Sequence, residues 1–101
     1  MAEEKILTLH PQGKAGVNIS KEKYQQIRNM ILRSLEGREA LTFRGLMEEV
    51  GQTLEGKFEG SISWYVTTVK LDLEARGVIE RLPGASPQRL RLAQNAQQEV
   101  E

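Results

Sequence analysis

Three arginines lie close together near the end of the chain, at Arg81, Arg89 and Arg91. Between residues 78 and 92 these three face one acidic side chain, Glu80, which leaves the segment with a local excess of +2. Guanidinium groups bind phosphate oxygens through paired hydrogen bonds, so the segment is a candidate phosphate-binding surface. Arg89 and Arg91 share a strand face by their spacing, and a matching register would add Arg81. The alternative is a solvated face whose charges keep an edge strand from aggregating.

A second set of candidate residues belongs to the helix predicted just before this segment. At 100° per residue its apolar residues fall on one side: Ile62, Val66, Val69 and Leu73. Ser63, Thr67 and Lys70 lie on or beside the other side, where hydroxyl and ammonium groups can bind DNA bases or phosphates. Trp64 and Leu71 share that outer side and are instead typical of a protein interface. A further alternative buries both sides of this helix between two other helices.

No catalytic or metal-binding constellation stands out. The acidic pairs Glu48-Glu49 and Asp72/Glu74 are expected on outer helix faces, where nothing desolvates a carboxylate as general acid-base chemistry requires. His10 is the one histidine and there is no cysteine, so no second imidazole or thiolate can share a metal ion with it. The sequence therefore predicts no enzyme activity, no cofactor and no metal.

Three helices are predicted from apolar stripes and end signals. The first follows an N-cap at Ser20 and ends at Gly37, and a short strand at 40–41 leads to a second helix capped by Thr42. The third begins at Ser61 or Ser63 and ends at Gly77. The stripes of the first two helices are Tyr24, Ile27, Ile31 and Leu35, then Phe43, Leu46, Met47, Val50 and Leu54.

Residues 78–82 and 88–92 alternate as two strands around a tip at 83–87. Helix, short strand, helix, turn, helix and hairpin is the order of a winged helix-turn-helix, an α+β fold in which the hairpin is the wing. This domain is predicted to span residues 20–92. Residues 1–19 are an extended N-terminal arm, expected to dock on the core or on a second copy, and residues 93–101 are a frayed polar tail.

The run WYVTTVKLDLEARGVIERLPGASPQRLRL closely resembles a small bacterial family of winged-helix proteins of uncharacterised role. The LHPQGKAGVNISKEKY segment resembles the N-terminal portion of the same family. This resemblance covers about residues 5–92; it implies the winged-helix architecture and transfers no catalytic or binding residue. More distantly, the LEARGVIER step resembles bacterial winged-helix transcription regulators.

The charge balance bears on the choice between partners. The chain of 101 residues has 14 basic and 14 acidic side chains, whereas a strong nucleic-acid binder usually has a basic excess. The first hypothesis is a cytoplasmic DNA-binding or transcription-regulator-like module that reads double-stranded DNA through Ser63, Thr67 and Lys70, with the three arginines on phosphates. The alternative is a protein-interaction or dimerisation domain that uses Trp64 and Leu71. Neither reading involves a membrane.

Overall fold

The computed structural model describes residues 4–84 and 87–93, which form three helices and five short strands. They are β1 (Lys5–Leu7), β2 (Asn18–Ser20), α1 (Lys21–Leu35), β3 (Leu41–Thr42), α2 (Phe43–Leu54), α3 (Ile62–Ala75), β4 (Ile79–Arg81) and β5 (Arg89–Leu92). The predicted order of three helices followed by a C-terminal hairpin is confirmed. Part of the predicted hairpin tip, and the predicted tail from residue 94 onward, lie outside the described residues.

Local side-chain chemistry sets the ends of the helices. Ser20, Thr42 and Ser61 each accept a hydrogen bond from the backbone N–H three residues later, with N to O distances of 3.0 to 3.3 Å. Such bonds satisfy amide groups that have no partner inside the helix. Gly37 and Gly77 follow α1 and α3 with φ of +76°, the left-handed conformation that glycine adopts without steric cost.

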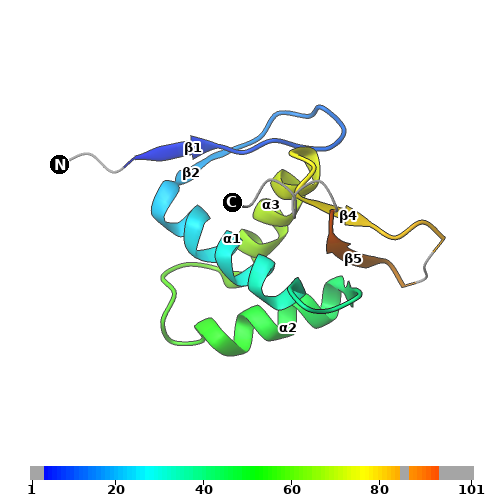
Figure 1. Cartoon of the computed structure of the whole chain (residues 1–101). Helices are drawn as coiled ribbons and strands as arrows, with labels where there is room; N and C mark the ends of the chain where they lie inside the picture. The colour runs from blue at the N-terminus through cyan, green and yellow to red at the C-terminus, as the bar shows by residue number, and fades with distance from the viewer. Residues whose placement is uncertain (1–3, 85–86, 94–101) are drawn as a thin grey trace.

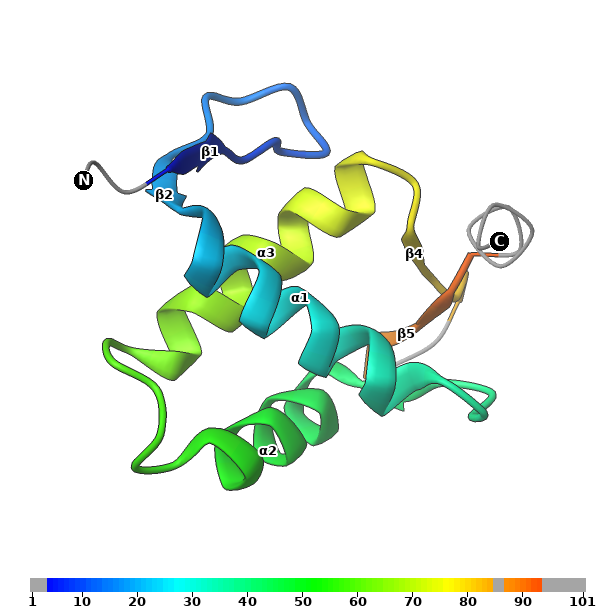
Figure 2. The ribbon, with the colours of Figure 1, turned by 60° about the vertical axis from the view of Figure 1, so that its left-hand side comes forward.

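The three helices bury one hydrophobic core between them, and Figures 1 and 2 show α1 crossing over α3 with α2 packed below both. The predicted stripes supply most of this core. Its buried members are Ile19, Tyr24, Ile27, Ile31, Leu35, Leu46, Val50, Leu54, Val66, Val69, Leu73, Ile79 and Leu90. Because this list draws on every helix, the helices and the C-terminal hairpin stabilise one another through a shared interior.

A three-stranded antiparallel sheet has the order β3-β5-β4. The short strand β3, which precedes α2, pairs with β5 in the register Leu41 to Leu90, so the start of α2 is tied to the C-terminal hairpin. Leu90 is fully buried and anchors the sheet to the helices. The β4–β5 hairpin extends away from the helices (Figure 1).

The N-terminal segment forms a second sheet, because β1 and β2 pair antiparallel with Ile6 opposite Ile19. This β1–β2 hairpin lies across the start of α1 and the end of α3 (Figures 1 and 2). Ile6 packs against the core, and Thr8 is 3% exposed. The hairpin closes tightly at Gly16, where a Cβ atom would stand 1.7 Å from the Thr8 carbonyl oxygen. Only glycine fits at position 16 without a shift of the backbone of Thr8 or of residue 16 itself.

Candidate functional site

The outer face of α3 is exposed and uncharged. Its exposed residues are Ser63, Trp64 and Thr67, while Leu71 is half-buried one turn further on. The Trp64 side chain is 46% exposed, so it is neither core nor fully solvated. We refer to Ser63, Trp64, Thr67 and Leu71 together as the α3 outer face.

Lys70, expected beside this face, is buried instead. Its side chain is 9% exposed, and its ammonium nitrogen lies 3.1 Å from an oxygen of Glu74. The same nitrogen lies 5.3 Å from the centre of the Phe43 ring, a distance at which a cation is attracted to an aromatic face. The Lys70 ammonium group is therefore held by contacts with Glu74 and Phe43 within the molecule.

Asp72 and Glu74 do not lie on an outer face, so that prediction is wrong. The Asp72 side chain is 0% exposed and the Glu74 side chain 6% exposed. Together with Lys70 they are the three charged residues of α3, and each one is paired within the molecule. The helix therefore keeps its charges on the inner side and leaves the α3 outer face without any.

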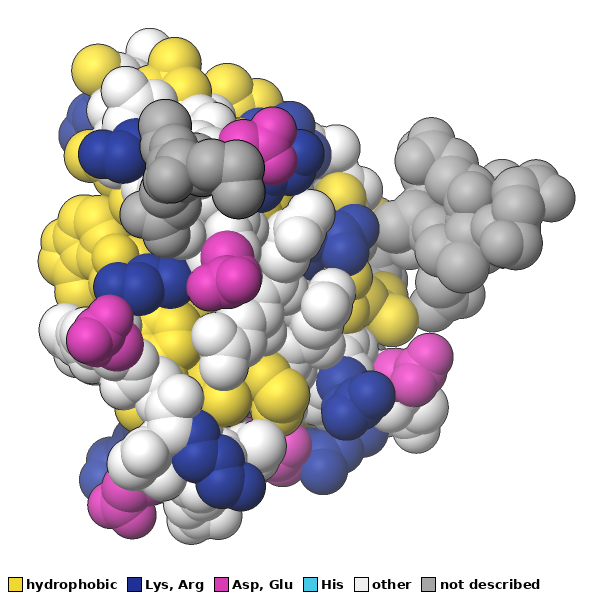
Figure 3. Space-filling view, turned by 90° about the vertical axis from the view of Figure 1, so that its left-hand side faces the viewer, with side chains coloured by type: hydrophobic (Ala, Val, Ile, Leu, Met, Phe, Trp, Pro, Cys, Tyr) yellow, Lys and Arg dark blue, Asp and Glu magenta, His cyan; other side chains and the backbone are white. Residues whose placement is uncertain are grey.

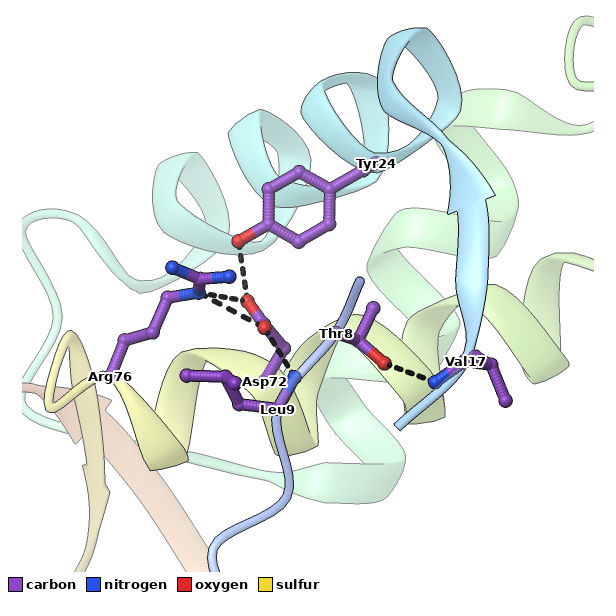
Figure 4. A network of polar contacts seen from close by, with 6 residues as sticks. All are labelled: Thr8, Leu9, Val17, Tyr24, Asp72 and Arg76. Carbon is purple, nitrogen blue, oxygen red and sulfur yellow. Dashed lines mark hydrogen bonds and ion pairs between the residues drawn. The ribbon is translucent and has the colours of Figure 1, made fainter. Parts of the chain in front are cut away.

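The Asp72 carboxylate is the centre of a buried polar network (Figure 4). The Leu9 backbone N–H donates to one carboxylate oxygen at 2.8 Å, and the Tyr24 hydroxyl donates to the other. The Nε of Arg76 lies 3.0 and 2.8 Å from the two oxygens. One carboxylate thus joins the N-terminal hairpin, α1 and the end of α3.

The pKa of the Tyr24 hydroxyl is changed by its burial and by the neighbouring Asp72 carboxylate. Burial raises the pKa of Tyr24 to about 12, and its hydrogen bond to Asp72 acts in the same direction, because both favour the neutral phenol over the phenolate. The hydroxyl therefore stays protonated as a hydrogen-bond donor at neutral pH. It holds the Asp72 carboxylate in place and is no candidate for a general base.

Sequence spacing contained a signal for this network. Asp72 follows Val69 by three residues and immediately precedes Leu73, so it lies at the edge of the apolar stripe rather than opposite it. Arg76 lies four residues after Asp72 on the same face, the spacing of a helical ion pair. A charged pair at the edge of an apolar stripe indicates that its carboxylate has a further hydrogen-bond partner elsewhere in the chain. In this structure that partner is Tyr24.

Arg89 and Arg91 share one face of the C-terminal hairpin, as their spacing predicts, but the register does not add Arg81 to them. Arg81 pairs in register with the buried Leu90, which turns its side chain toward the helices. There its guanidinium holds Glu74 through two nitrogens at 3.0 and 3.2 Å. Arg89 and Arg91 lie on the opposite face of the sheet.

The two outer arginines differ from each other. Arg91 lies opposite Glu80, and its Nε is 2.6 Å from a carboxylate oxygen of that residue. Arg89 is exposed and forms no ion pair with any acidic side chain in the described part of the chain. Of the three expected phosphate contacts, Arg89 is the one whose guanidinium is left for solvent.

Trp64 belongs to a small aromatic cluster where α3 begins. Its ring meets Tyr65 edge to face, with centroids 4.9 Å apart, and Tyr65 meets Phe58 at 5.1 Å in the same way. The Lys23 ammonium lies 5.6 Å from the Tyr65 centroid. Edge-to-face contacts between aromatic rings are favourable, so Tyr65 supports the indole while part of Trp64 remains an exposed apolar surface. Figure 3 shows hydrophobic side chains at the surface between charged groups.

An open cleft of about 500 Å³ lies between the loop after β1 and the start of the C-terminal hairpin. His10, Glu74, Gly77 and Arg81 line it, and the His10 Nδ1 accepts a hydrogen bond from the Gln12 N–H at 3.1 Å. Glu74 and Arg81 form an ion pair here, and the same carboxylate also pairs with Lys70. Within residues 4–84 and 87–93, no group of three or more histidine and acidic side chains has the arrangement of a metal site.

The described helices are too short or too polar to cross a membrane. Comparisons with curated proteins and with solved structures find no match. A family model described as a family of unknown function, DUF6958, matches residues 5–90. This span includes the β1–β2 hairpin, all three helices and most of the C-terminal hairpin. The chain therefore belongs to the family of unknown function DUF6958.

Proposed function

We propose that this protein is a winged-helix module that binds a protein partner through the α3 outer face. The observation that carries the proposal is the exposure of Trp64, at 46%, on a helix face that has no charge. A large aromatic side chain in a rigid setting is a favoured anchor of protein interfaces. The half-buried Leu71 continues the apolar surface along the helix.

The winged-helix assignment rests on the order and pairing of elements. Three helices precede a hairpin, and the strand between the first two helices joins that hairpin in the order β3-β5-β4. This arrangement leaves one face of the third helix uncovered by the other two helices. In this chain that face is the α3 outer face, which explains why Trp64 is exposed on a helix whose opposite side is buried.

Charge supports a protein partner over DNA. Sequence-independent affinity for DNA comes mainly from lysine and arginine on phosphates. Lys70 is buried against Glu74, while Arg81 and Arg91 are paired with Glu74 and Glu80. These pairings remove most of the positive charge on which a DNA interface at α3 and the hairpin would depend.

Affinity capture with matched variants tests the proposal. We expect the wild-type chain to retain a specific protein from a lysate of its source cells, Trp64→Ser to lose it, and Gln52→Ser to keep it. Gln52 is an exposed polar residue of α2, so its substitution is a control for surface change alone. Trp64 is the one tryptophan of the chain, so adding the purified partner should shift its emission to shorter wavelength. An unshifted emission spectrum, or equal retention by Trp64→Ser, would contradict the proposal.

A second candidate function is DNA binding, and it is favoured by one group of residues. Arg89 is exposed, and Ser63 and Thr67 present hydroxyl groups on the α3 outer face. If the chain binds duplex DNA through the hairpin, Arg89→Ala should reduce the slope of log affinity against log salt by about 1. Lys21→Ala, which removes an exposed charge at the start of α1, should leave that slope unchanged. Equal slopes for Arg89→Ala and the wild type would exclude this mode of DNA binding.

A further inference from the structure

Strand β1 has one edge that pairs with no other strand of the described residues. The Glu4 carbonyl accepts from the Lys21 N–H and the Thr8 N–H donates to the Val17 carbonyl, both at 2.9 Å. Bonded pairs alternate along an antiparallel ladder. Lys5 and Leu7 alternate with the residues of β1 that bond to β2. Their backbone N–H and C=O groups therefore point away from β2. They make no hydrogen bond with another described residue.

This unpaired edge has a definite end. The next outward N–H along the strand, that of Leu9, donates to Asp72 on α3. Figure 4 shows this bond on one side of the segment and the contact between Thr8 and Val17 on the other. Helix α3 therefore blocks the edge at Leu9, and the accessible part runs from Lys5 to Leu7.

The side chains beside this edge are exposed. Leu7 is 56% exposed, the largest fraction among the large hydrophobic residues described. A row of unpaired backbone groups next to an exposed leucine is a template for another strand. The chain has no net charge, so two copies approach each other without overall repulsion.

We infer that the β1 edge pairs antiparallel with the β1 edge of a second copy, about a two-fold axis at Ile6. In this register Lys5 lies opposite Leu7 of the other strand, and the outward backbone groups form four hydrogen bonds, two for each Lys5–Leu7 pair. A register centred on Lys5 would place two lysines opposite each other. A register centred on Leu7 would require the Leu9 N–H, which Asp72 already holds.

The register can be tested with opposite charges at one position. Leu7→Glu places a carboxylate opposite Lys5 of the second copy, whereas Leu7→Lys places two ammonium groups opposite each other. Because two-fold symmetry makes each substitution act twice, we expect Leu7→Lys to raise the dissociation constant at least about tenfold. Leu7→Glu should leave the constant unchanged or lower it.

Two proline variants test the edge itself. Leu7→Pro removes an outward N–H and leaves the bonds between β1 and β2 in place, so it should abolish pairing. Asn18→Pro removes the corresponding outward N–H from β2 and should have no effect on pairing. Circular dichroism checks that each variant is folded, and the charge pair remains a test if a proline variant is not.

The measurement is sedimentation equilibrium of the full chain from about 10 µM to 1 mM, where small interfaces associate. The inference predicts a monomer–dimer equilibrium with the sensitivities given above. A wild-type chain that stays monomeric to about 1 mM would overturn it, as would equal weakening by Leu7→Lys and Leu7→Glu. Loss of the dimer in Trp64→Ser would also overturn it, since that result would place self-association on the α3 outer face. Because Trp64 is not part of the β1 edge, this inference and the proposed function fail separately.

Discussion

The Asp72 carboxylate takes its hydrogen bonds from three separate parts of the chain. Leu9 belongs to the N-terminal hairpin, Tyr24 to α1 and Arg76 to the end of α3. A buried charge destabilises a protein unless it is paired and hydrogen-bonded, and here the Arg76 guanidinium and two further donors compensate it. The network therefore depends on all three segments being in place at once.

Removal of one donor tests this network. Tyr24→Phe leaves a lone pair of Asp72 unsatisfied, so we expect the free energy of unfolding at neutral pH to fall by about 1–3 kcal/mol. Urea unfolding followed by circular dichroism measures the change. Tyr65→Phe, which alters a half-buried tyrosine outside the network, should cost less.

The raised pKa of Tyr24 also predicts a pH dependence. Well below pH 10.0 the phenol is protonated in both the folded and the unfolded state, so its contribution to stability is complete there. Between pH 10.0 and about 12 the unfolded phenol ionises first, and stability falls with rising pH. We expect wild type and Tyr65→Phe to show this alkaline loss and Tyr24→Phe to lack it. The same alkaline slope in Tyr24→Phe would contradict the assignment.

Two glycines have opposite roles at the level of elements. Gly16 lies in the N-terminal hairpin against the Thr8 backbone, whereas Gly51 lies in α2 with no atom within 4 Å of its expected Cβ position. The first is required by a close approach of two chain segments. The second costs helix stability through backbone entropy.

Alanine at each position separates these roles. Gly16→Ala should lower the free energy of unfolding by about 1–3 kcal/mol, because its Cβ displaces the hairpin from α1 and α3. Gly51→Ala should raise it by about 0.5–1 kcal/mol. Denaturant midpoints measure both changes. A neutral Gly16→Ala would show that the N-terminal hairpin contributes little to the stability of the fold.

The helices were predictable from sequence because their signals are local. Ser20, Thr42 and Ser61 cap the helices through atoms three residues away, and the apolar stripes repeat within each helix. Local spacing places Asp72 at the edge of the apolar stripe, but the partners that hold Asp72 and Arg81 were not predictable in this way. The first depends on Tyr24 and on a hairpin 63 residues earlier in the sequence, and the second on the register between β4 and β5.

At the scale of the whole molecule, the charged residues of α3 and the two arginines Arg81 and Arg91 are paired within the chain, and apolar surface remains. Among the described residues, the large hydrophobic side chains that are exposed are Leu7, Leu9, Val17 and Trp64. Trp64 lies on the α3 outer face, and the other three belong to the N-terminal segment. The molecule thus presents two apolar regions, and we propose a protein partner for the first and a second copy for the second.

The most direct test of the central claim, that the α3 outer face binds protein and does not read DNA, is a DNA titration. Labelled random-sequence duplex is titrated with the wild-type chain at about 50 and 200 mM salt, and fluorescence anisotropy is followed. The account predicts no rise in anisotropy at the lower salt concentration. Binding at about 50 mM salt that is lost at about 200 mM would contradict it and would establish phosphate contacts as the basis of function.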